Sequence, residues 1–321
     1  MRLRTKTVAA LAAGVVALTT LAACASTPSA SDAGSAAPAS DTGSFAVDKN
    51  TLVFATVPDK AGSDSAWQPL EQYIEKKTGL HVEFKPTTDY AALIAAGIAG
   101  QVDVGAFSGA TYTLAEKKGA KFDLVSAVGV EAGASEPGYY SEAIVPKSSG
   151  ISKVSDFKGK TICFVSPEST SGFFFPLQTL KKAGISVQST GNDANGNPQF
   201  KDFTAYFAGA HDKSVAAVES GQCQVGFAED AEADAAADLK VVDKELVPGG
   251  PLVISSTLPK AVKDKLVAAL KDVTLDDITS SGAEVSDAFS ANFQFAKEVK
   301  PDFYDQIKDI CATIPAAGCA G

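Results

Sequence analysis

The chain has 321 residues, of which 45% are hydrophobic, and its formal net charge is −10. An acidic chain without clusters of lysine and arginine among aromatic residues repels nucleic acid, so a nucleic-acid-binding function is excluded. No internal repeat of fixed period is present, and the length is sufficient for two lobes with separate cores.

The first 23 residues predict a bacterial lipoprotein signal peptide. Arg2, Arg4 and Lys6 precede a short apolar run over 8–21, and Leu-Ala-Ala then leads directly to Cys24. The alternative is a membrane-spanning helix, for which the apolar run is short. We expect cleavage before Cys24, lipid attachment at its sulfur, and an extracytoplasmic protein anchored to the outer face of the cell membrane. Loss of three basic residues and no acidic residue changes the formal charge from −10 to −13.

Residues 24–48 are mostly small and polar, which predicts a flexible tether because little of this segment can be buried. The rest of the chain alternates between apolar runs and amphipathic segments, a pattern typical of α/β units with a parallel sheet covered on both faces. For a first lobe over 49–143 and 251–321 we expect strands at 51–57, 82–85 and 102–107 and helices at 65–77, 90–99, 111–118, 259–271 and 288–310.

For a second lobe over 144–250, the apolar runs and helical periods continue in the same way. We expect strands at 161–165, 224–227 and 239–242, helices at 172–182 and 212–220, a loop over 190–198, and a strand or short helix near Phe203. Strands at 139–145 and 252–255 are expected to cross between the lobes. The predicted fold class is therefore α/β, with two doubly wound sheets joined by two crossover strands and a ligand cleft between them.

A candidate anion site follows the predicted strand over 161–165. Ser169, Thr170 and Ser171 place three hydroxyls directly before a helix, and no lysine or arginine lies within 166–176. Hydroxyls and the unpaired amides of a helix amino terminus together form a neutral cradle for an oxyanion. The same residues also fit an ordinary hydroxyl cap, an interpretation that the spacing leaves open.

Four cysteines follow Cys24, an even number that predicts two disulfides in an oxidising location. Cys311 and Cys319 enclose a short segment and are expected to pair, which leaves Cys163 and Cys223 for each other in the second lobe. With two histidines and no Cys-x-x-Cys motif, neither a metal site nor a cofactor is expected.

Four motifs occur in a particular order along the folded part of the chain. They are Thr88-Asp-Tyr-Ala91 before a helix, Pro137-Gly-Tyr139, Ser169-Thr-Ser-Gly172 with Pro176 shortly after, and a segment from Gly209 to Gly221 that contains His211. In this order they resemble the phosphate-, phosphite- and phosphonate-binding lipoproteins of ABC transporters. The resemblance implies a two-lobed periplasmic-binding-protein fold of type II that closes by a hinge, a monomer, and a permease and an ATPase as partners.

The resemblance also implies the ligand-binding residues Tyr90, Tyr139, Ser169, Thr170, Ser171 and His211. The chain departs from the family pattern at Gly250, where aminophosphonate-binding members carry an acidic residue. This departure predicts a preference for small phosphorus oxyanions over aminoethylphosphonate, because a buried ammonium would lack a partner. Glu229, Asp230 and Glu232 are alternative sources of the missing charge.

Other functions fit the residues less well. An enzyme such as a secreted phosphoesterase is disfavoured because Ser171 lies outside any Gly-x-Ser-x-Gly motif, no Walker motif is present, and His211 has no evident carboxylate–nucleophile relay. We therefore predict no catalytic residue. The same fold carrying a sulfonate or nitrate ligand remains an alternative, as does a lipid-anchored structural protein.

Overall fold

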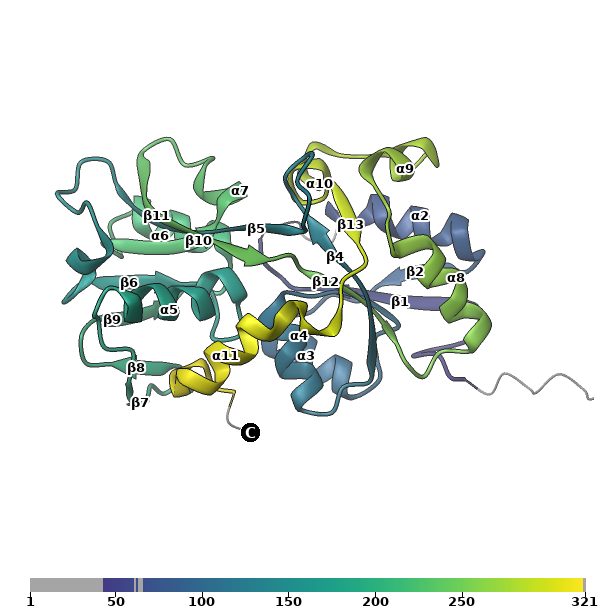
Figure 1. The fold of residues 1–321 in the computed structure, drawn as a ribbon, viewed down its shortest axis with the longest axis horizontal. Coiled ribbons are helices and arrows are strands. Elements are labelled where there is room, and N and C mark those ends of the chain that lie inside the picture. The colour runs from purple at the N-terminus through teal and green to yellow at the C-terminus, as the bar shows by residue number, and fades with distance from the viewer. Residues whose placement is uncertain (1–42, 61, 63–65, 320–321) are drawn as a thin grey trace, which may run out of the picture. The chain divides into compact units, whose positions relative to one another are not determined.

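Two β-sheets organise the described part of the chain in the computed structural model (Figure 1). The structure describes residues 43–60, 62 and 66–319, so the predicted signal peptide, Cys24 and most of the predicted tether lie outside the described residues. Within that part, the first sheet has the order β13 (Phe295–Lys297), β4 (Phe122–Gly129), β12 (Pro251–Ser255), β3 (Val104–Ala106), β1 (Thr51–Thr56) and β2 (His81–Phe84). The second has the order β11 (Leu239–Pro248), β5 (Gly138–Pro146), β10 (Val225–Glu229), β6 (Thr161–Phe164) and β9 (Thr204–Phe207).

Helices connect most of the strands. They are α2 (Gln68–Thr78), α3 (Tyr90–Ile98), α4 (Gly109–Lys117), α5 (Phe175–Lys182), α6 (His211–Glu219), α7 (Asp230–Ala233), α8 (Lys260–Leu270), α9 (Leu275–Ser280), α10 (Asp287–Asn292) and α11 (Asp305–Thr313). A π-helical turn, η2 (Thr170–Phe174), leads into α5, and the 3-10 turns are η1 (Val154–Phe157), η3 (Pro301–Tyr304) and η4 (Pro315–Ala317). Over the described residues, no helix combines the length and the apolar character needed to cross a membrane.

Alternating residues of β1 explain how the first sheet is covered on both faces. Leu52 and Phe54 pack with Leu70 and Ile74 of α2, whereas Ala55 belongs to a cluster on the opposite face that includes α3. β1 pairs in parallel with β2 and β3, but β12 lies antiparallel between β3 and β4. The expected parallel sheet is therefore mixed, because the chain returns from the second sheet along β12.

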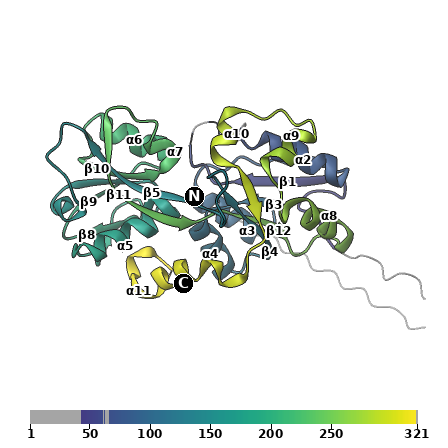
Figure 2. The ribbon, with the colours of Figure 1, turned by 45° about the horizontal axis from the view of Figure 1, so that its top comes forward.

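The second sheet also has a parallel centre. β6 pairs in parallel with both β9 and β10, whereas β5 runs antiparallel to β10 and β11. Figure 2 shows α6 and α5 on opposite sides of this sheet. Phe164 of β6 packs against Phe173 and Phe227, with ring centroids 5.3 and 5.8 Å away. Aromatic packing therefore holds the π-helical turn η2, which leads into α5, against the sheet.

Two strand predictions require correction. β4 has no counterpart among the expected strands, since its polar residues Asp123 and Ser126 interrupt the apolar pattern; the Ser126 hydroxyl donates to the Leu270 carbonyl. The expected loop over 190–198 contains parts of a hairpin of β7 (Ser189–Asn192) and β8 (Pro198–Phe200), whose tight connection is rich in Asn, Asp and Gly.

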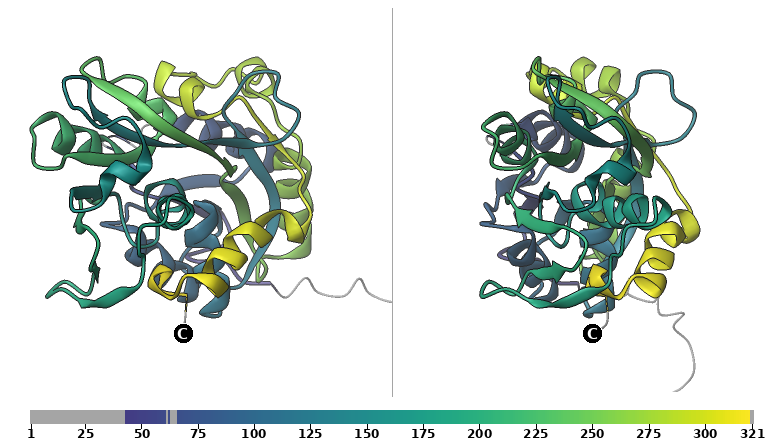
Figure 3. Two further views of the ribbon diagram at one scale, coloured as in Figure 1. Left: turned by 60° about the vertical axis from the view of Figure 1, so that its left-hand side comes forward. Right: turned by 90° about the vertical axis from the view of Figure 1, so that its left-hand side faces the viewer.

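The first expected lobe boundary, 143/144, is also wrong. It falls inside β5, which pairs with β11 from Gly138 to Pro146, so the chain crosses between β4 and β5, earlier than predicted. The strands expected to cross, 139–145 and 252–255, each belong to one sheet, β5 to the second and β12 to the first, and the return crossing is the connection between β11 and β12. The views in Figure 3 show β5 and β11 running side by side as long antiparallel strands.

The predicted helix over 288–310 is wrong. The structure has α10, β13, η3 and α11 in this region. The helical period is broken by β13, which pairs with β4, and by Pro301, which cannot continue an α-helix and instead begins a 3-10 turn. The Tyr304 hydroxyl donates to the Gly249 carbonyl and Lys181 of α5 donates to the Thr313 carbonyl, so this region contacts both halves rather than only the first.

Two further expectations fail because apolar residues extend across the predicted boundaries. The tether was expected to reach residue 48, but Phe45 packs against the first half and Ala46 donates its amide to Asp103. The two lobes were expected to have separate cores. One cluster instead includes Leu93 of α3, Phe164 of β6 and Ile310 of α11, so the hydrophobic core is shared between the two halves.

Candidate functional site

Most candidate site residues follow the carboxyl ends of strands, and Tyr139 lies at the amino end of β5, which runs antiparallel to β10 and so begins at the same edge of the sheet. Thr56 is the last residue of β1, and Glu229 is the last residue of β10. Tyr90 lies after β2, the three hydroxyl residues after β6 and His211 after β9, while Tyr139 lies in β5. Helices α3, α5 with its initial turn η2, and α6 begin at the same residues. Open α/β sheets bind ligands at this edge, where helix amino termini provide amide donors.

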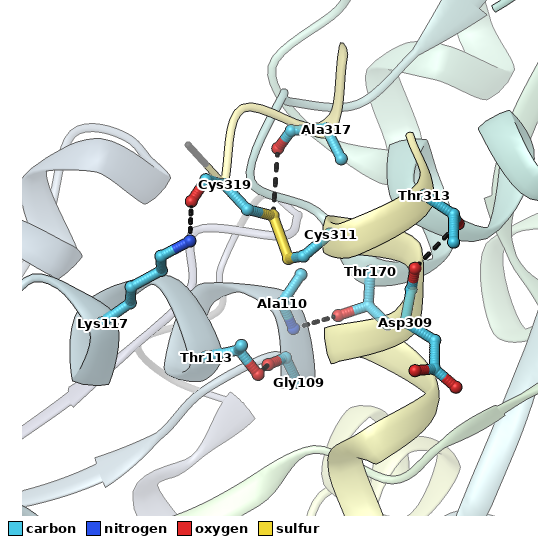
Figure 4. Close-up of a disulfide and its surroundings, with 10 residues drawn as sticks. All are labelled: Gly109, Ala110, Thr113, Lys117, Thr170, Asp309, Cys311, Thr313, Ala317 and Cys319. Atoms are coloured by element: carbon cyan, nitrogen blue, oxygen red, sulfur yellow. Dashed lines mark hydrogen bonds between the residues drawn. A yellow bond between two sulfur atoms is a disulfide. The ribbon is translucent and has the colours of Figure 1, made fainter. Parts of the chain in front are cut away.

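Ser169 and Thr170 each already have a structural role. The Ser169 hydroxyl accepts from the Gly172 amide at 3.1 Å, so the ordinary helix cap considered for this sequence is present. The Thr170 hydroxyl accepts from the Ala110 amide at 2.8 Å, which joins η2 to the first turn of α4 (Figure 4). Both hydroxyls still carry a hydrogen that they can donate.

Ser171 differs from its two neighbours. Its side chain is fully buried, and its oxygen makes no hydrogen bond within the described part of the chain, although it faces the Tyr139 phenol. The Ser171 carbonyl accepts from the Ser141 hydroxyl at 2.6 Å, which fixes the backbone. A buried hydroxyl of this kind is costly unless another group satisfies it.

Two tyrosines lie beside these serines. Tyr90 is 1% exposed and its phenol faces the Ser169 hydroxyl. Burial raises the pKa of both Tyr90 and Tyr139 above the ordinary value, and the carboxylates of Asp59 and Glu229 act in the same direction. Both phenols therefore keep their protons near neutral pH and can donate hydrogen bonds.

His211 is held as a neutral hydrogen-bond donor. It is 3% exposed, and burial lowers its pKa to about 4. Its Nδ1 accepts from the Glu229 amide at 2.9 Å, so the hydrogen of the neutral ring is on Nε2. The His211 amide donates to the Asp59 carbonyl at 2.7 Å and thereby links α6 to the loop after β1.

A cavity adjoins these groups. Its lining includes Tyr139 and Glu229, together with residues that the sequence analysis did not select: Thr56, Asp59, Trp67, Phe107, Ser108 and Asn292. Tyr90, the three hydroxyl residues and His211 are buried and do not line the cavity. Ser171 faces Tyr139 and His211 contacts the Glu229 amide, so these residues adjoin the cavity wall. Thr56 could have been selected from its position at a strand end, whereas Trp67 and Asn292 reach the cavity only through tertiary packing.

Two polar atoms of the cavity wall resemble Ser171 in lacking a partner. Thr56 Oγ1 and Glu229 Oε1 are shielded from solvent and make no hydrogen bond with any residue that the structure describes. Burial raises the pKa of Glu229 to about 7, against the lowering effect of Lys60, which pairs with Glu232 at 3.2 Å. The site thus contains buried groups that can donate or accept toward a ligand.

Gly250 lines the same cavity, and its neighbours explain why no side chain stands there. A Cβ at this position would lie 2.6 Å from the Phe107 carbonyl oxygen, and one at Gly249 would lie 2.0 Å from the Val128 carbonyl oxygen. Backbone forms this part of the wall, so the acidic side chain that the resemblance implies for aminophosphonate binding would require the chain to move here. Glu229, in contrast, places a carboxylate in the cavity.

The cysteines are paired in the structure. Cys163 of β6 is bonded to Cys223, just before the adjacent strand β10, and Cys311 of α11 is bonded to Cys319. Figure 4 shows the second disulfide beside the Thr170–Ala110 contact, with Lys117 donating to the Cys319 carbonyl. Among the described residues, no group of three His, Cys, Asp or Glu side chains is suited to hold a metal ion.

Comparison with known proteins places this architecture in a family. The family model described as "ABC transporter, phosphonate, periplasmic substrate-binding protein" matches residues 54–304. The phosphate-import protein PhnD of Mycolicibacterium smegmatis is 32% identical over 288 residues, which cover 84% of this chain and 88% of the relative. The phosphonates-binding periplasmic protein of Escherichia coli is 30% identical over 214 residues, which cover 62% of this chain and 59% of the relative.

Among solved structures, PhnD1 of Prochlorococcus marinus in complex with methylphosphonate matches with a TM-score of 0.67 and 17% identity, over 83% of this chain and 99% of that chain. The fold is therefore that of two-lobed periplasmic binding proteins. The family match spans most of the chain, from β1 to the residues just before α11. The chain belongs to the phosphonate family of extracytoplasmic substrate-binding proteins, the components that deliver ligands to ABC importers.

Proposed function

We propose that the chain captures a small phosphorus oxyanion, namely a phosphonate, phosphite or phosphate, and releases it to its permease. The observation that carries this proposal is a set of buried donors, of which Thr56 and Tyr139 line one cavity and Ser171, His211 and Tyr90 adjoin Tyr139 or Glu229 of its wall. Ser171 and Thr56 have hydroxyls without partners, His211 presents Nε2–H, and the phenols of Tyr90 and Tyr139 keep their protons. An oxyanion with several oxygens would satisfy these donors together.

The electrostatics of the site support an anion despite the acidic chain. Helices α3, α4 and α6 and the turn η2 all begin near the cavity, so the positive ends of their dipoles lie close to it. Their contribution is local, whereas the net charge of −10 acts over longer distances and is screened by salt. Neutral donors select by geometry and hydrogen-bond number, which suits a compact tetrahedral ligand.

The relatives agree with this assignment. One is a phosphate-import protein, another is a phosphonates-binding protein, and a structural neighbour holds methylphosphonate. These relatives are substrate-binding transport proteins, and we propose the same non-enzymatic role, as a monomer, for this chain. Tyr90, Tyr139, Ser169, Thr170, Ser171 and His211 are proposed to surround the ligand, with Glu229 beside it.

A ligand panel tests the proposal. We expect phosphate, phosphite or methylphosphonate to raise the melting temperature of the purified protein, because a ligand that binds only the folded state stabilises it. Sulfate, nitrate and an alkanesulfonate should give smaller shifts at equal concentration. Trp67, the single tryptophan, lines the cavity and provides a fluorescence signal for the same titrations. A larger shift with the sulfonate or nitrate than with every phosphorus anion would assign the chain a different ligand.

We also propose that Cys24 carries the lipid anchor. The motif Leu-Ala-Ala-Cys24 lies outside the described residues, so this proposal depends on the sequence. In the native host, Cys24→Ser is expected to move the protein from the membrane fraction to the soluble fraction. Retention of the variant on membranes after high-salt and alkaline washing would show that another segment anchors it.

A further inference from the structure

Glu229 is an unusual residue to find in an anion site. It ends β10 and lines the cavity with Tyr139 and Thr56, and its Oε1 is shielded from solvent without a hydrogen-bond partner among the described residues. Its backbone amide donates to His211 Nδ1, which fixes the residue in place. A buried oxygen of this kind needs a donor, and a fully ionised oxyanion offers none.

The charges around Glu229 make an ionised oxyanion beside it still less favourable. Carboxylates of Asp230 and Glu232, on the adjoining helix α7, act on it from one side, and Asp59 from the loop after β1 lies in the same cavity wall. Lys60 is the cation that acts on Glu229, and it also pairs with Glu232. His211 is neutral, and Tyr90 and Tyr139 are protonated. A second full negative charge beside the Glu229 carboxylate would therefore be repelled.

We propose that Glu229 selects ligands that bring a proton, and that this proton lies between Glu229 Oε1 and one ligand oxygen in the complex. The proposal rests on the proposed function and adds its specificity-determining residue. One shared proton satisfies the buried oxygen and places a hydrogen between the two facing oxygens, which would otherwise repel each other. It also distinguishes anions of similar size at a pH above the pKa of Glu229, where the carboxylate is ionised and sulfate and sulfonates have no proton to share.

The phosphorus ligands themselves differ in this respect. A phosphate or phosphonate group loses its second proton near neutrality, at a pKa of roughly 6 for a phosphate monoester. Inorganic phosphate then still holds one hydrogen, whereas the methylphosphonate dianion holds none. A complex of methylphosphonate with the Glu229 carboxylate must consequently take up one proton from solution at alkaline pH, and a complex of phosphate need not.

The wild-type protein tests this directly through the dissociation constants of inorganic phosphate and methylphosphonate from pH 7 to 9.5. By proton linkage, methylphosphonate affinity should fall by up to about tenfold for each pH unit above its second ionisation, while phosphate affinity changes by less than about threefold. The two ligands share the same protein, so unfolding or a general charge effect would weaken both. Parallel pH profiles for the two ligands would overturn the proposal.

Glu229→Gln gives the second arm of the test, since the amide can donate to any oxyanion without a proton. We expect a flat methylphosphonate profile and, at a pH well above the pKa of Glu229, a phosphate-to-sulfate preference that decreases by about tenfold or more. Glu219→Gln is the matched control, because it removes a carboxylate at the end of α6 that neither lines the cavity nor acts on Glu229; it should keep the wild-type profile and preference. Unchanged sulfate discrimination in the Glu229→Gln variant, with the variant folded, would contradict the proposal.

Aminoethylphosphonate tests the remaining interpretation, in which Glu229 pairs with an ammonium group instead of sharing a proton. If this ligand binds the wild type more tightly than methylphosphonate and loses that advantage in Glu229→Gln, then Glu229 is an ammonium partner and the shared proton is wrong. Failure of every phosphorus anion to bind the wild type would instead remove the proposed function itself. The two failures are thus distinguishable.

Discussion

Ser171→Ala is expected to weaken binding of the best phosphorus ligand by roughly ten- to a hundredfold, or about 1.5–3 kcal/mol, because a hydrogen bond to a charged group is lost. The ligand-free protein should be as stable as the wild type or slightly more stable. The reason is that the buried Ser171 hydroxyl faces the Tyr139 phenol without a hydrogen bond of good geometry in the described structure, so its removal sacrifices little internal hydrogen bonding. Calorimetric titration gives the affinity, and denaturant unfolding without ligand gives the stability.

Ser149→Ala is the matched control. Ser149 also has a shielded hydroxyl that makes no hydrogen bond in the described structure, but it lies in the turn after β5, beyond the end of that strand opposite to Tyr139, whereas Ser171 adjoins Tyr139 of the cavity wall. Its substitution should leave affinity unchanged. Equal affinity of Ser171→Ala and the wild type would exclude the Ser171 hydroxyl from the ligand's contacts.

The largest effect on stability is expected from the disulfide between Cys163 and Cys223. Its partners are 60 residues apart in sequence and at most 1% exposed. For a closed loop of this length, loss of the cross-link costs about 4 kcal/mol through the entropy of the unfolded chain. Cys163→Ala combined with Cys223→Ala should therefore lower the free energy of unfolding by this amount, measured with guanidinium under non-reducing conditions.

The second disulfide provides an internal comparison. Cys311 and Cys319 are only 8 residues apart, and the same relation gives about 2.5 kcal/mol for the corresponding double alanine variant. Peptide mapping of unreduced protein should recover both cross-links. The prediction fails if the short loop proves the more stabilising of the two, or if mapping finds Cys163 joined to Cys319.

The candidate site shows which features a local sequence pattern can predict and which it cannot. The hydroxyls of Ser169 to Ser171 could be selected from the sequence as a candidate anion site because they lie between an apolar strand and a helix. The cap that Ser169 forms on the Gly172 amide is likewise a local interaction. That Thr170 accepts from Ala110, 60 residues away, and that Ser171 alone lacks a partner were not predictable. These facts depend on which distant atoms surround each hydroxyl.

By itself, the sequence determined the α/β class, the positions of most helices and central strands, the candidate lipoprotein signal and the family resemblance. Each of these is encoded over a few neighbouring residues, as a hydrophobic period, a charge pattern or a motif. The strand β4, the segmented region after residue 287 and the core shared by both halves emerged only in the structure, because they depend on pairing and packing between distant segments. The tertiary structure likewise placed Glu229 in the cavity and excluded a side chain at Gly250, since burial and the close approach of the Phe107 carbonyl arise only once the two sheets are assembled.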